Sequence, residues 1–235
     1  MLWLIVIAGL AAWLMTGALR RYALARSLLD VPNARSSHTL PTPRGGGLAF
    51  VVAFLVGALG LALWGAVDPS ALVAVLGAGG LVAVIGFMDD HGHIAARWRL
   101  LGHFAAAAWG LAWMGGMPPI EIFGWPLHAL WLSVPLGLLY LVWLLNLYNF
   151  MDGIDGIASI EAICVCLGGT LLFWLVGAPG AAWLPILLAA TVAGFPIWNF
   201  PPARLFMGHA GSGFLGTALG LPAFLAGWLA PPLFW

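Results

Sequence analysis

Residues 71–99 read ALVAVLGAGGLVAVIGFMDDHGHIAARWR, an uncharged apolar run that ends in a cluster of aspartates, histidines and arginines. The apolar part, 71–88, is about as long as an α-helix must be to cross the hydrocarbon core of a bilayer. We therefore predict that this stretch is a membrane-spanning helix and that its carboxyl end opens into a polar connection.

The composition of the whole chain agrees with a membrane protein. Hydrophobic residues make up 63% of it, charged residues only 7%, and the mean hydropathy is +1.04. No soluble core of this length could bury so much apolar surface. Eight apolar runs are candidates for spans: 2–19, 48–67, 71–88, 100–117, 129–145, 157–177, 181–198 and 214–230. We predict a single domain, 1–235, that is all-α: a polytopic helical bundle with about eight transmembrane helices.

The arginines predict how this bundle is oriented. The chain has no lysine, and its arginines fall in alternate connections: Arg20, Arg21, Arg26, Arg35 and Arg44, then Arg97 and Arg99, then Arg204. By the positive-inside rule these connections are cytoplasmic and both termini lie outside. The first run has no basic residue before it, so we expect an uncleaved anchor. Most acidic residues lie on the arginine side, which predicts a cytoplasmic active face.

The first arginine-bearing connection, 30–47, reads DVPNARSSHTLPTPRGGG. Its prolines and glycines exclude a continuous helix. Arg20, Arg21 and Arg26, which precede it, are interpreted as topology determinants. Glycines that open a helix leave unpaired backbone N–H groups, and an arginine beside them can add a bidentate contact to an anion. We therefore predict a phosphate site that includes Arg44, Gly45 and Gly46.

Two further connections carry paired carboxylates. Asp89 and Asp90 follow a span directly, and adjacent carboxylates there repel unless a cation or proton offsets them. They are either a solvated interfacial pair or groups for metal ligation or base catalysis. The connection 146–156, NLYNFMDGIDG, has no basic residue.

If a helix begins within 146–156, Asp152 and Asp155 share one of its faces, with Asn149 another turn back. A single acid would suffice to favour the helix dipole, so the set argues for a hard cation such as Mg²⁺ bound through oxygen. Glu161, deeper in the next run, fits a structural role as well as a functional one.

The last of these connections, within 201–216, reads PPARLFMGHAGSGFLG. Its glycines precede a span, which predicts a nest-like anion site formed by Gly211 and Ser212, with Arg204 nearby. His209 could be a metal ligand, a proton carrier or an inert interface residue. Two anion-binding segments and two carboxylate pairs on one membrane face fit metal-assisted phosphoryl transfer to a lipid-borne nucleophile.

These four stretches, in this order, closely resemble the polyprenyl-phosphate N-acetylhexosamine-1-phosphate transferases, glycosyltransferase family 4. That family includes the phospho-MurNAc-pentapeptide translocase and the enzymes that initiate O-antigen and teichoic acid synthesis. The PNxRSSH form of the first connection is most similar to the O-antigen-initiating branch. The resemblance implies transfer of sugar 1-phosphate from a UDP-N-acetylhexosamine to undecaprenyl phosphate, with release of UMP, at the cytoplasmic face of the bacterial inner membrane.

The resemblance also implies roles for individual residues. Asp89 and Asp90 match the paired aspartates of the family, which act in nucleophile activation and in placing metal or phosphate. Asn149, Asp152 and Asp155 match its nucleotide and metal loop, and His38 and Arg44 match its substrate-side first loop. Mg²⁺, or Mn²⁺ in its place, is the implied cofactor, with Asp90, Asn149 and His209 as its expected ligands. No nucleic acid partner is expected, and a homodimer is left open.

The chain departs from the family pattern in two places. The family has an aspartate, a principal Mg²⁺ ligand, where this chain has His209, and an imidazole is a softer ligand than a hard cation prefers. The chain also ends after the eighth run, where members usually continue through two or three more, so a C-terminally shortened form is expected. Two alternatives are therefore kept: an inactive or partner-dependent homologue that acts as an assembly subunit, and a transporter. A transporter would place its charges near the bilayer midplane, not at one interface.

Overall fold

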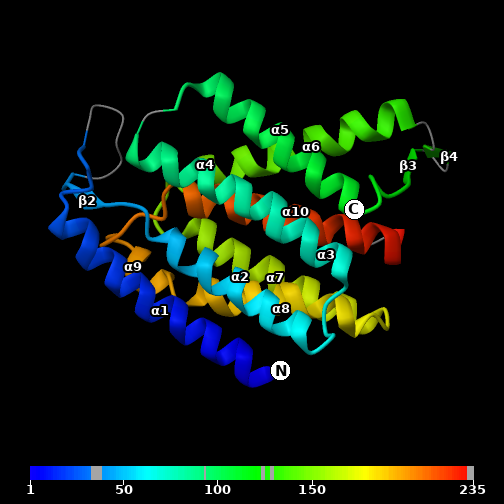
Figure 1. The fold of residues 1–235 in the computed structure, drawn as a ribbon, viewed down its shortest axis with the longest axis horizontal. Coiled ribbons are helices and arrows are strands. Elements are labelled where there is room, and N and C mark those ends of the chain that lie inside the picture. Colours follow the sequence, from blue (N-terminus) through cyan, green and yellow to red (C-terminus); the bar gives the residue numbers. More distant parts are fainter. Residues whose placement is uncertain (33–38, 93, 123–124, 128–129, 232–235) are drawn as a thin grey trace.

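The computed structural model describes residues 1–235 except 33–38, 93, 123–124, 128–129 and 232–235. It is a bundle of helices with only short strand pairs, which confirms the all-α membrane architecture (Figure 1). The helical elements are α1 Leu2–Ala25, α2 Gly47–Leu63, α3 Pro69–Ala74, the π-helical turn Val75–Gly79, α4 Gly80–His91, α5 Ala96–Trp113, α6 Leu130–Met151, α7 Ile157–Leu175, the 3-10 turn Pro179–Ala182, α8 Trp183–Ala193, α9 Pro196–Asn199 and α10 His209–Leu229.

Each of the eight predicted runs contains a helix of the bundle, although the ends differ. Among the described residues, five helices are long and apolar enough to cross a membrane: Leu2–Ala25, Pro69–His91, Trp131–Met151, Ile157–Leu175 and His209–Leu229. Gly47–Leu63 and Pro179–Ala193 are apolar but shorter. Several helices continue past the first charged residue on the arginine side, because intrahelical hydrogen bonds do not depend on apolarity.

Two strand pairs were not predicted. β1 (Leu29–Asp30) pairs antiparallel with β2 (Thr42–Pro43), and β3 (Ile120–Ile122) pairs antiparallel with β4 (Trp125–Leu127). β2 lies at the left end of the bundle in Figure 1, and β3 and β4 lie at the right end. The first pair ties the segment after α1 to the segment that leads into α2.

Helix α10 is the centre of the bundle, with α4 and α6 on one side and α2 on the other (Figure 1). Every residue from Ala210 to Leu221 is buried. Glycines let the neighbouring backbones come close: a Cβ at Gly211 would lie 2.7 Å from the Cα of Gly47, and one at Gly216 would lie 2.5 Å from the Cα of Leu145. Such contacts are typical of helices that pack in a membrane.

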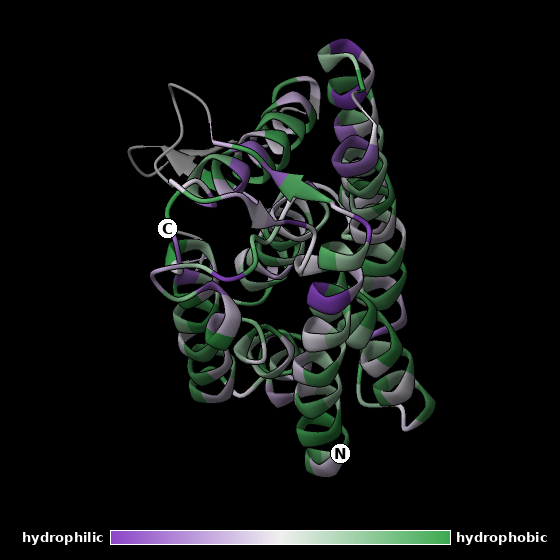
Figure 2. Cartoon of the chain, turned by 90° about the vertical axis from the view of Figure 1, so that its left-hand side faces the viewer, coloured by the Kyte–Doolittle hydropathy of each residue, from purple (hydrophilic) through white to green (hydrophobic). Residues whose placement is uncertain are grey.

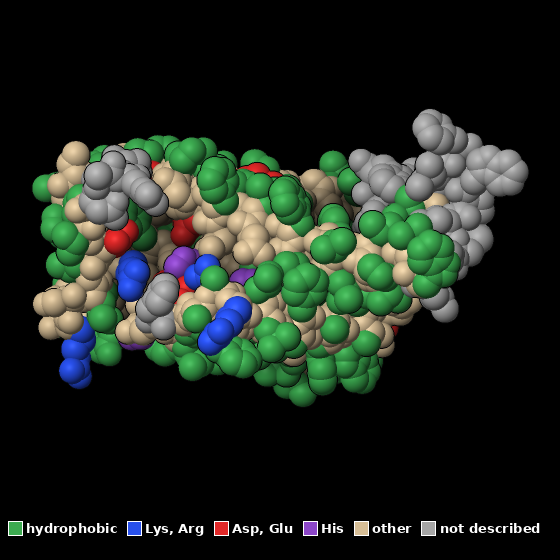
Figure 3. Space-filling model, turned by 90° about the horizontal axis from the view of Figure 1, so that it is seen from above, with side chains coloured by type: hydrophobic (Ala, Val, Ile, Leu, Met, Phe, Trp, Pro, Cys, Tyr) green, Lys and Arg blue, Asp and Glu red, His purple; other side chains and the backbone are tan. Residues whose placement is uncertain are grey.

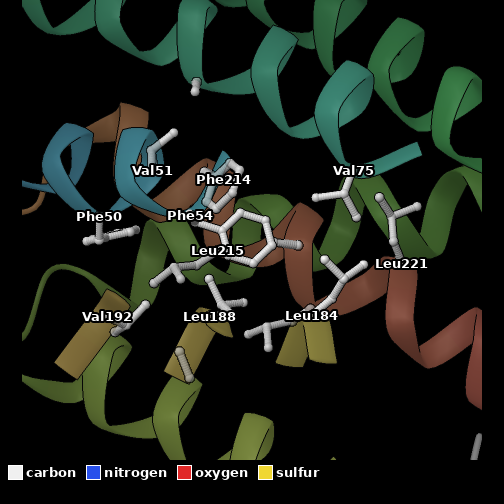
Figure 4. Close-up of a cluster of buried hydrophobic side chains, with 14 of the residues drawn as sticks. Phe50, Val51, Phe54, Val75, Leu184, Leu188, Val192, Phe214, Leu215 and Leu221 are labelled. Atoms are coloured by element: carbon white, nitrogen blue, oxygen red, sulfur yellow. The ribbon is translucent and has the colours of Figure 1, made fainter. Parts of the chain in front are cut away.

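The buried core joins α2, α8 and α10. Figure 4 shows Phe54, Leu188 and Phe214 from these three helices pointing toward one another. The rings of Phe54 and Phe214 meet edge to face, with their centroids 5.5 Å apart. Outward-facing side chains are apolar over most of the molecule, whereas charged and histidine side chains gather toward one end (Figure 3).

Successive helices run in alternate directions, so the connections with the predicted motifs lie at one end. Every arginine that the structure describes lies at or near that end, and Figure 2 looks onto it, with hydrophilic residues among its loops and helix ends. The first residues of α1 and the last of α10 lie toward the opposite end (Figure 1).

We expect both termini to face the outside of the membrane, because the arginine-bearing end is held on the cytoplasmic side. A reporter enzyme that is active only outside the membrane, fused after residue 235, should be active. The same reporter fused after Gly92 serves as the control and should be inactive. An inactive fusion after residue 235 together with an active one after Gly92 would show that the orientation is inverted.

Candidate active site

Four acidic side chains lie at the arginine-bearing end. Asp89 and Asp90 come from the last turn of α4, and Asp152 and Asp155 come from the turn between α6 and α7. The two pairs converge because α4 and α6 both pack against α10. Asp89 and Asp90 are 7% and 5% exposed, so they are not the solvated interfacial pair that was one of the interpretations.

Asp90 caps the central helix. Its Oδ1 accepts the backbone N–H of His209 at 3.1 Å, and its Oδ2 accepts that of Ala210 at 3.3 Å. A carboxylate is favoured at a helix N-terminus by the unpaired N–H groups and the helix dipole. The approach requires glycine at 208, which has φ 79°, because a Cβ there would lie 2.7 Å from the Asp90 Oδ2.

The prediction that Gly211 and Ser212 form an anion-binding nest is wrong in its geometry. Both lie inside α10, and both backbone N–H groups donate to the carbonyl of Gly208 at 3.1 Å. Gly211 packs against α2, and the Ser212 hydroxyl donates to the Asn149 Oδ1 at 2.9 Å. The sequence hides this because the same glycines that suit a nest also suit close helix packing.

Asp89 is held by a different set of donors. Arg99 Nη1 lies 2.5 Å from its Oδ2, and the backbone N–H of Ile94 donates to its Oδ1 at 3.0 Å. A buried carboxylate with a charged partner and an amide donor is fixed in place, and removing the charged partner leaves a buried charge that the amide offsets only in part. Asp89 therefore has little freedom to move toward a substrate.

His209 lies against both carboxylates of α4. Its Nδ1 is 3.0 Å from the Asp89 Oδ2 and 3.4 Å from the Asp90 Oδ1, although neither contact has hydrogen-bond alignment.

Arg44 reaches the site, but the glycines after it do not form the predicted anion cradle. Arg44 Nη2 donates to the backbone carbonyl of Asp90 at 2.6 Å. The N–H groups of Gly46 and Gly47, predicted to be unpaired, donate to the carbonyls of Phe206 and Met207 at 3.0 and 2.9 Å. Gly45, with φ 91°, makes the turn before them. The half-buried Arg44 guanidinium is therefore the group of this segment that can meet an anion.

The segment around Asp152 is a turn, so the conditional prediction of a shared helix face is wrong. α6 ends at Met151 and α7 begins at Ile157. Asp155 Oδ2 accepts the backbone N–H of Ala203 at 2.9 Å. The turn is fixed to the 200–208 segment by that bond and by Asn199, which accepts from the N–H of Gly156 at 2.9 Å and donates to the carbonyl of Leu205 at 3.1 Å.

Asp152 is the least compensated acid of the four. Burial raises its pKa well above the ordinary value, and the negative charges of Asp90 and Asp155 raise it further, while a hydrogen bond from the Gly208 N–H opposes the rise. A cation would relieve this. Within the described part of the chain, however, no three imidazole, thiol or carboxyl groups converge to hold a metal ion by themselves.

The comparisons with known proteins show the family of the chain. The model of glycosyl transferase family 4 matches residues 72–227, which include all four acids and His209. The chain belongs to glycosyl transferase family 4. Its relatives include a decaprenyl-phosphate N-acetylglucosaminephosphotransferase of Mycolicibacterium smegmatis, 32% identical over 91% of this chain and 57% of that protein.

Two other members of family 4 are similar over much of the chain. One is a probable undecaprenyl-phosphate N-acetylglucosaminyl 1-phosphate transferase of Bacillus subtilis, 26% identical over 97% of this chain and 64% of that protein. The other is a phospho-N-acetylmuramoyl-pentapeptide-transferase of Moorella thermoacetica, 32% identical over 78% of this chain and 61% of that protein. The chain thus spans roughly three-fifths of the length of these relatives.

One of the predicted site residues, Arg204, is not brought to the acids. The Arg204 guanidinium donates to the carbonyl of Ile197 at 2.8 Å and lies over the ring of Trp198. His38 lies outside the described residues. Glu161 is in α7, and its Oε2 is buried without a hydrogen-bond partner among the described residues.

Sequence reasoning missed two polar residues of this site. Asn199 is buried between the two connections, and His103 is buried in α5 one turn after Arg99. In the sequence, Asn199 is only a polar residue directly after the apolar run 181–198, and His103 is only a histidine four residues after an arginine. Neither signal indicates which distant segment the side chain will contact.

We expect Asp152→Asn to raise thermal stability at neutral pH. A carboxyl whose pKa is raised on folding ionises more readily in the unfolded chain, so ionisation lowers the free energy of unfolding as pH rises above the ordinary carboxyl value. The amide does not ionise. The melting temperature in detergent should therefore rise by about 2–4 °C at pH 8 and little at pH 4. A gain confined to low pH would contradict the assignment.

Proposed function

We propose that the chain transfers N-acetylhexosamine 1-phosphate from a UDP-sugar to undecaprenyl phosphate at the cytoplasmic face of the bacterial inner membrane. The reaction releases UMP and would initiate a cell-envelope polysaccharide such as the lipopolysaccharide O-antigen. Family membership supports the reaction class. The observation that carries the proposal is the position of Asp152, whose charge the Gly208 N–H offsets only in part, near Asp90 and Asp155 at the arginine-bearing end of the bundle.

Charge neutralisation is the main requirement of phosphoryl transfer to a phosphate nucleophile. Arg99 is committed to Asp89, whereas Arg44 lies against the Asp90 carbonyl and can approach the diphosphate of the sugar nucleotide. We propose that Asp152 binds Mg²⁺ jointly with diphosphate oxygens, with Asn149 and Asp90 beside it. Mg²⁺ favours one or two carboxylates combined with substrate phosphates, which fits the described residues, since no three ligands converge among them. Mn²⁺ could take the same place.

The lipid substrate would reach the acids from the plane of the membrane. Phe150, Ile154 and Ile157 are exposed apolar side chains around the turn that bears Asp152 and Asp155. Apolar side chains at the rim of a polar site suit a substrate with a hydrocarbon chain and a phosphate head. The phosphate oxygen of the lipid would attack the phosphorus attached to the sugar, and the bond to UMP would break.

An inactive assembly subunit is the second candidate, because His209 presses against the two carboxylates of α4. The test is UMP release by the purified chain with undecaprenyl phosphate, Mg²⁺ and a panel of UDP-sugars. UMP release that requires both the lipid and one UDP-N-acetylhexosamine supports the proposal. Absence of UMP release with every sugar, from protein that is folded and membrane-embedded, favours the assembly subunit.

A further inference from the structure

Two arginines far apart in sequence share one aromatic ring at the arginine-bearing end. The guanidinium carbons of Arg20 in α1 and Arg204 after α9 each lie 5.8 Å from the ring centroid of Trp198. Arg20 Nε also donates to the carbonyl of Arg204 at 3.2 Å. Gly17 gives the ring room against α1, because a Cβ there would lie 3.1 Å from the Trp198 Cζ2. We call Arg20, Trp198 and Arg204 the arginine clamp.

The clamp holds two positive charges without a carboxylate. Among the described residues, neither Arg20 nor Arg204 forms an ion pair with an acid. Arg20 donates to the backbone carbonyl of Arg204, and Arg204 donates to that of Ile197. These bonds use a minority of the five N–H donors on each guanidinium. Stacking on the ring keeps these planes in place, so the remaining donors are arranged for an anion.

Apolar side chains flank the clamp. Ile197 is 56% exposed and Phe200 is 63% exposed, on either side of Trp198 in sequence. α1 and α9 lie on the side of the bundle away from α4 and α5, so the clamp is separated from Asp89 and Asp90 (Figure 1). Tryptophan and arginine side chains are typical of the membrane interface. Two arginines beside an exposed apolar surface at that level match the anionic head and the acyl chain of a phospholipid.

We propose that the arginine clamp binds the phosphate of an anionic phospholipid of the surrounding leaflet, with an acyl chain lying against Ile197 and Phe200. The site borders the carboxylate cluster, because Ala203 beside Arg204 donates its N–H to Asp155, but it contains none of the acids and does not depend on the transfer reaction. The alternative is that Arg20 and Arg204 only set the membrane topology. In that case, replacing this pair would affect phospholipid binding no more than replacing any other two arginines.

The test measures the apparent dissociation constant of phosphatidylglycerol for the full chain by native mass spectrometry from neutral detergent. Arg20→Gln with Arg204→Gln should weaken binding on the order of tenfold or more, because both charge-assisted contacts to one phosphate are lost. Arg26→Gln with Arg97→Gln is the matched control. It removes the same charge, and each of these arginines lies over a ring of its own, Tyr22 or Trp98.

The control should bind phosphatidylglycerol as the unchanged chain does. Arg204→Gln alone, at an exposed side chain, should weaken binding severalfold, which guards against a folding defect in the double variant. Equal weakening in both double variants, no weakening in either, or equal binding of neutral phosphatidylcholine by the unchanged chain would overturn the proposal. Binding of undecaprenyl phosphate at the clamp in place of phosphatidylglycerol would also overturn it.

Discussion

Asp90→Asn and Asp152→Asn should each lower the rate of sugar-phosphate transfer by on the order of a hundredfold or more. Asp90 fixes the start of α10 beside the reacting groups, and Asp152 is the acid that a cation and a diphosphate would join. Neither amide carries the negative charge that such an arrangement needs. Initial rates of UMP release, measured with saturating undecaprenyl phosphate, give the loss directly.

Asp68→Asn is the matched control for this pair. Asp68 caps α3 through a hydrogen bond from the Ala71 N–H at 3.0 Å, so the same chemical change is made at another helix N-terminus, far from the acids. Its transfer rate should equal that of the unchanged chain. Near-normal turnover in Asp90→Asn or Asp152→Asn would show that the metal and phosphate centre lies elsewhere.

His209→Asp should increase the response of the protein to Mg²⁺. Nδ1 of the imidazole lies within 3.4 Å of carboxylate oxygens of both Asp89 and Asp90, so the substitution places a third acid against two buried ones. Without a divalent cation the variant should melt at a lower temperature than the unchanged chain, because like charges repel. With Mg²⁺ it should recover, with an apparent affinity roughly tenfold tighter than that of the unchanged chain.

His209→Asn is the control that removes the imidazole without adding a charge, so it separates these two effects of His209→Asp. All three proteins are titrated with Mg²⁺ and with Mn²⁺. We expect the unchanged chain to be less active with Mg²⁺ than His209→Asp and to favour the softer Mn²⁺. Full turnover of the unchanged chain at ordinary Mg²⁺, lost on substitution to aspartate, would instead assign His209 an adapted role in the reaction.

The helices were predictable because a membrane-spanning helix satisfies its own backbone hydrogen bonds. A sufficiently long apolar run is therefore enough to identify it. The run 71–88 and its closing aspartates needed no knowledge of the rest of the chain. The convergence of the acids near the arginines could be predicted for a similar reason, since alternating spans bring alternate connections to one end.

The details of the site depend on partners that are distant in sequence. Gly46 and Gly47 look like free donors until Phe206 and Met207 accept their N–H groups. Ser212 looks like an anion ligand in the sequence, but it is buried within α10 and its hydroxyl donates to Asn149. Local patterns specify which groups a residue offers, whereas tertiary packing decides which of those groups remain free for a substrate.

The central claim is that this chain moves a phosphoryl group that carries a sugar, and label position tests it most directly. The unchanged chain, in vesicles that contain undecaprenyl phosphate, is supplied with UDP-N-acetylglucosamine or UDP-N-acetylgalactosamine labelled in the β-phosphorus. Our account predicts that the label enters the lipid with the sugar and that unlabelled UMP is released. Label that leaves in UDP while the sugar joins the lipid, or that never reaches the lipid with either donor, would contradict it.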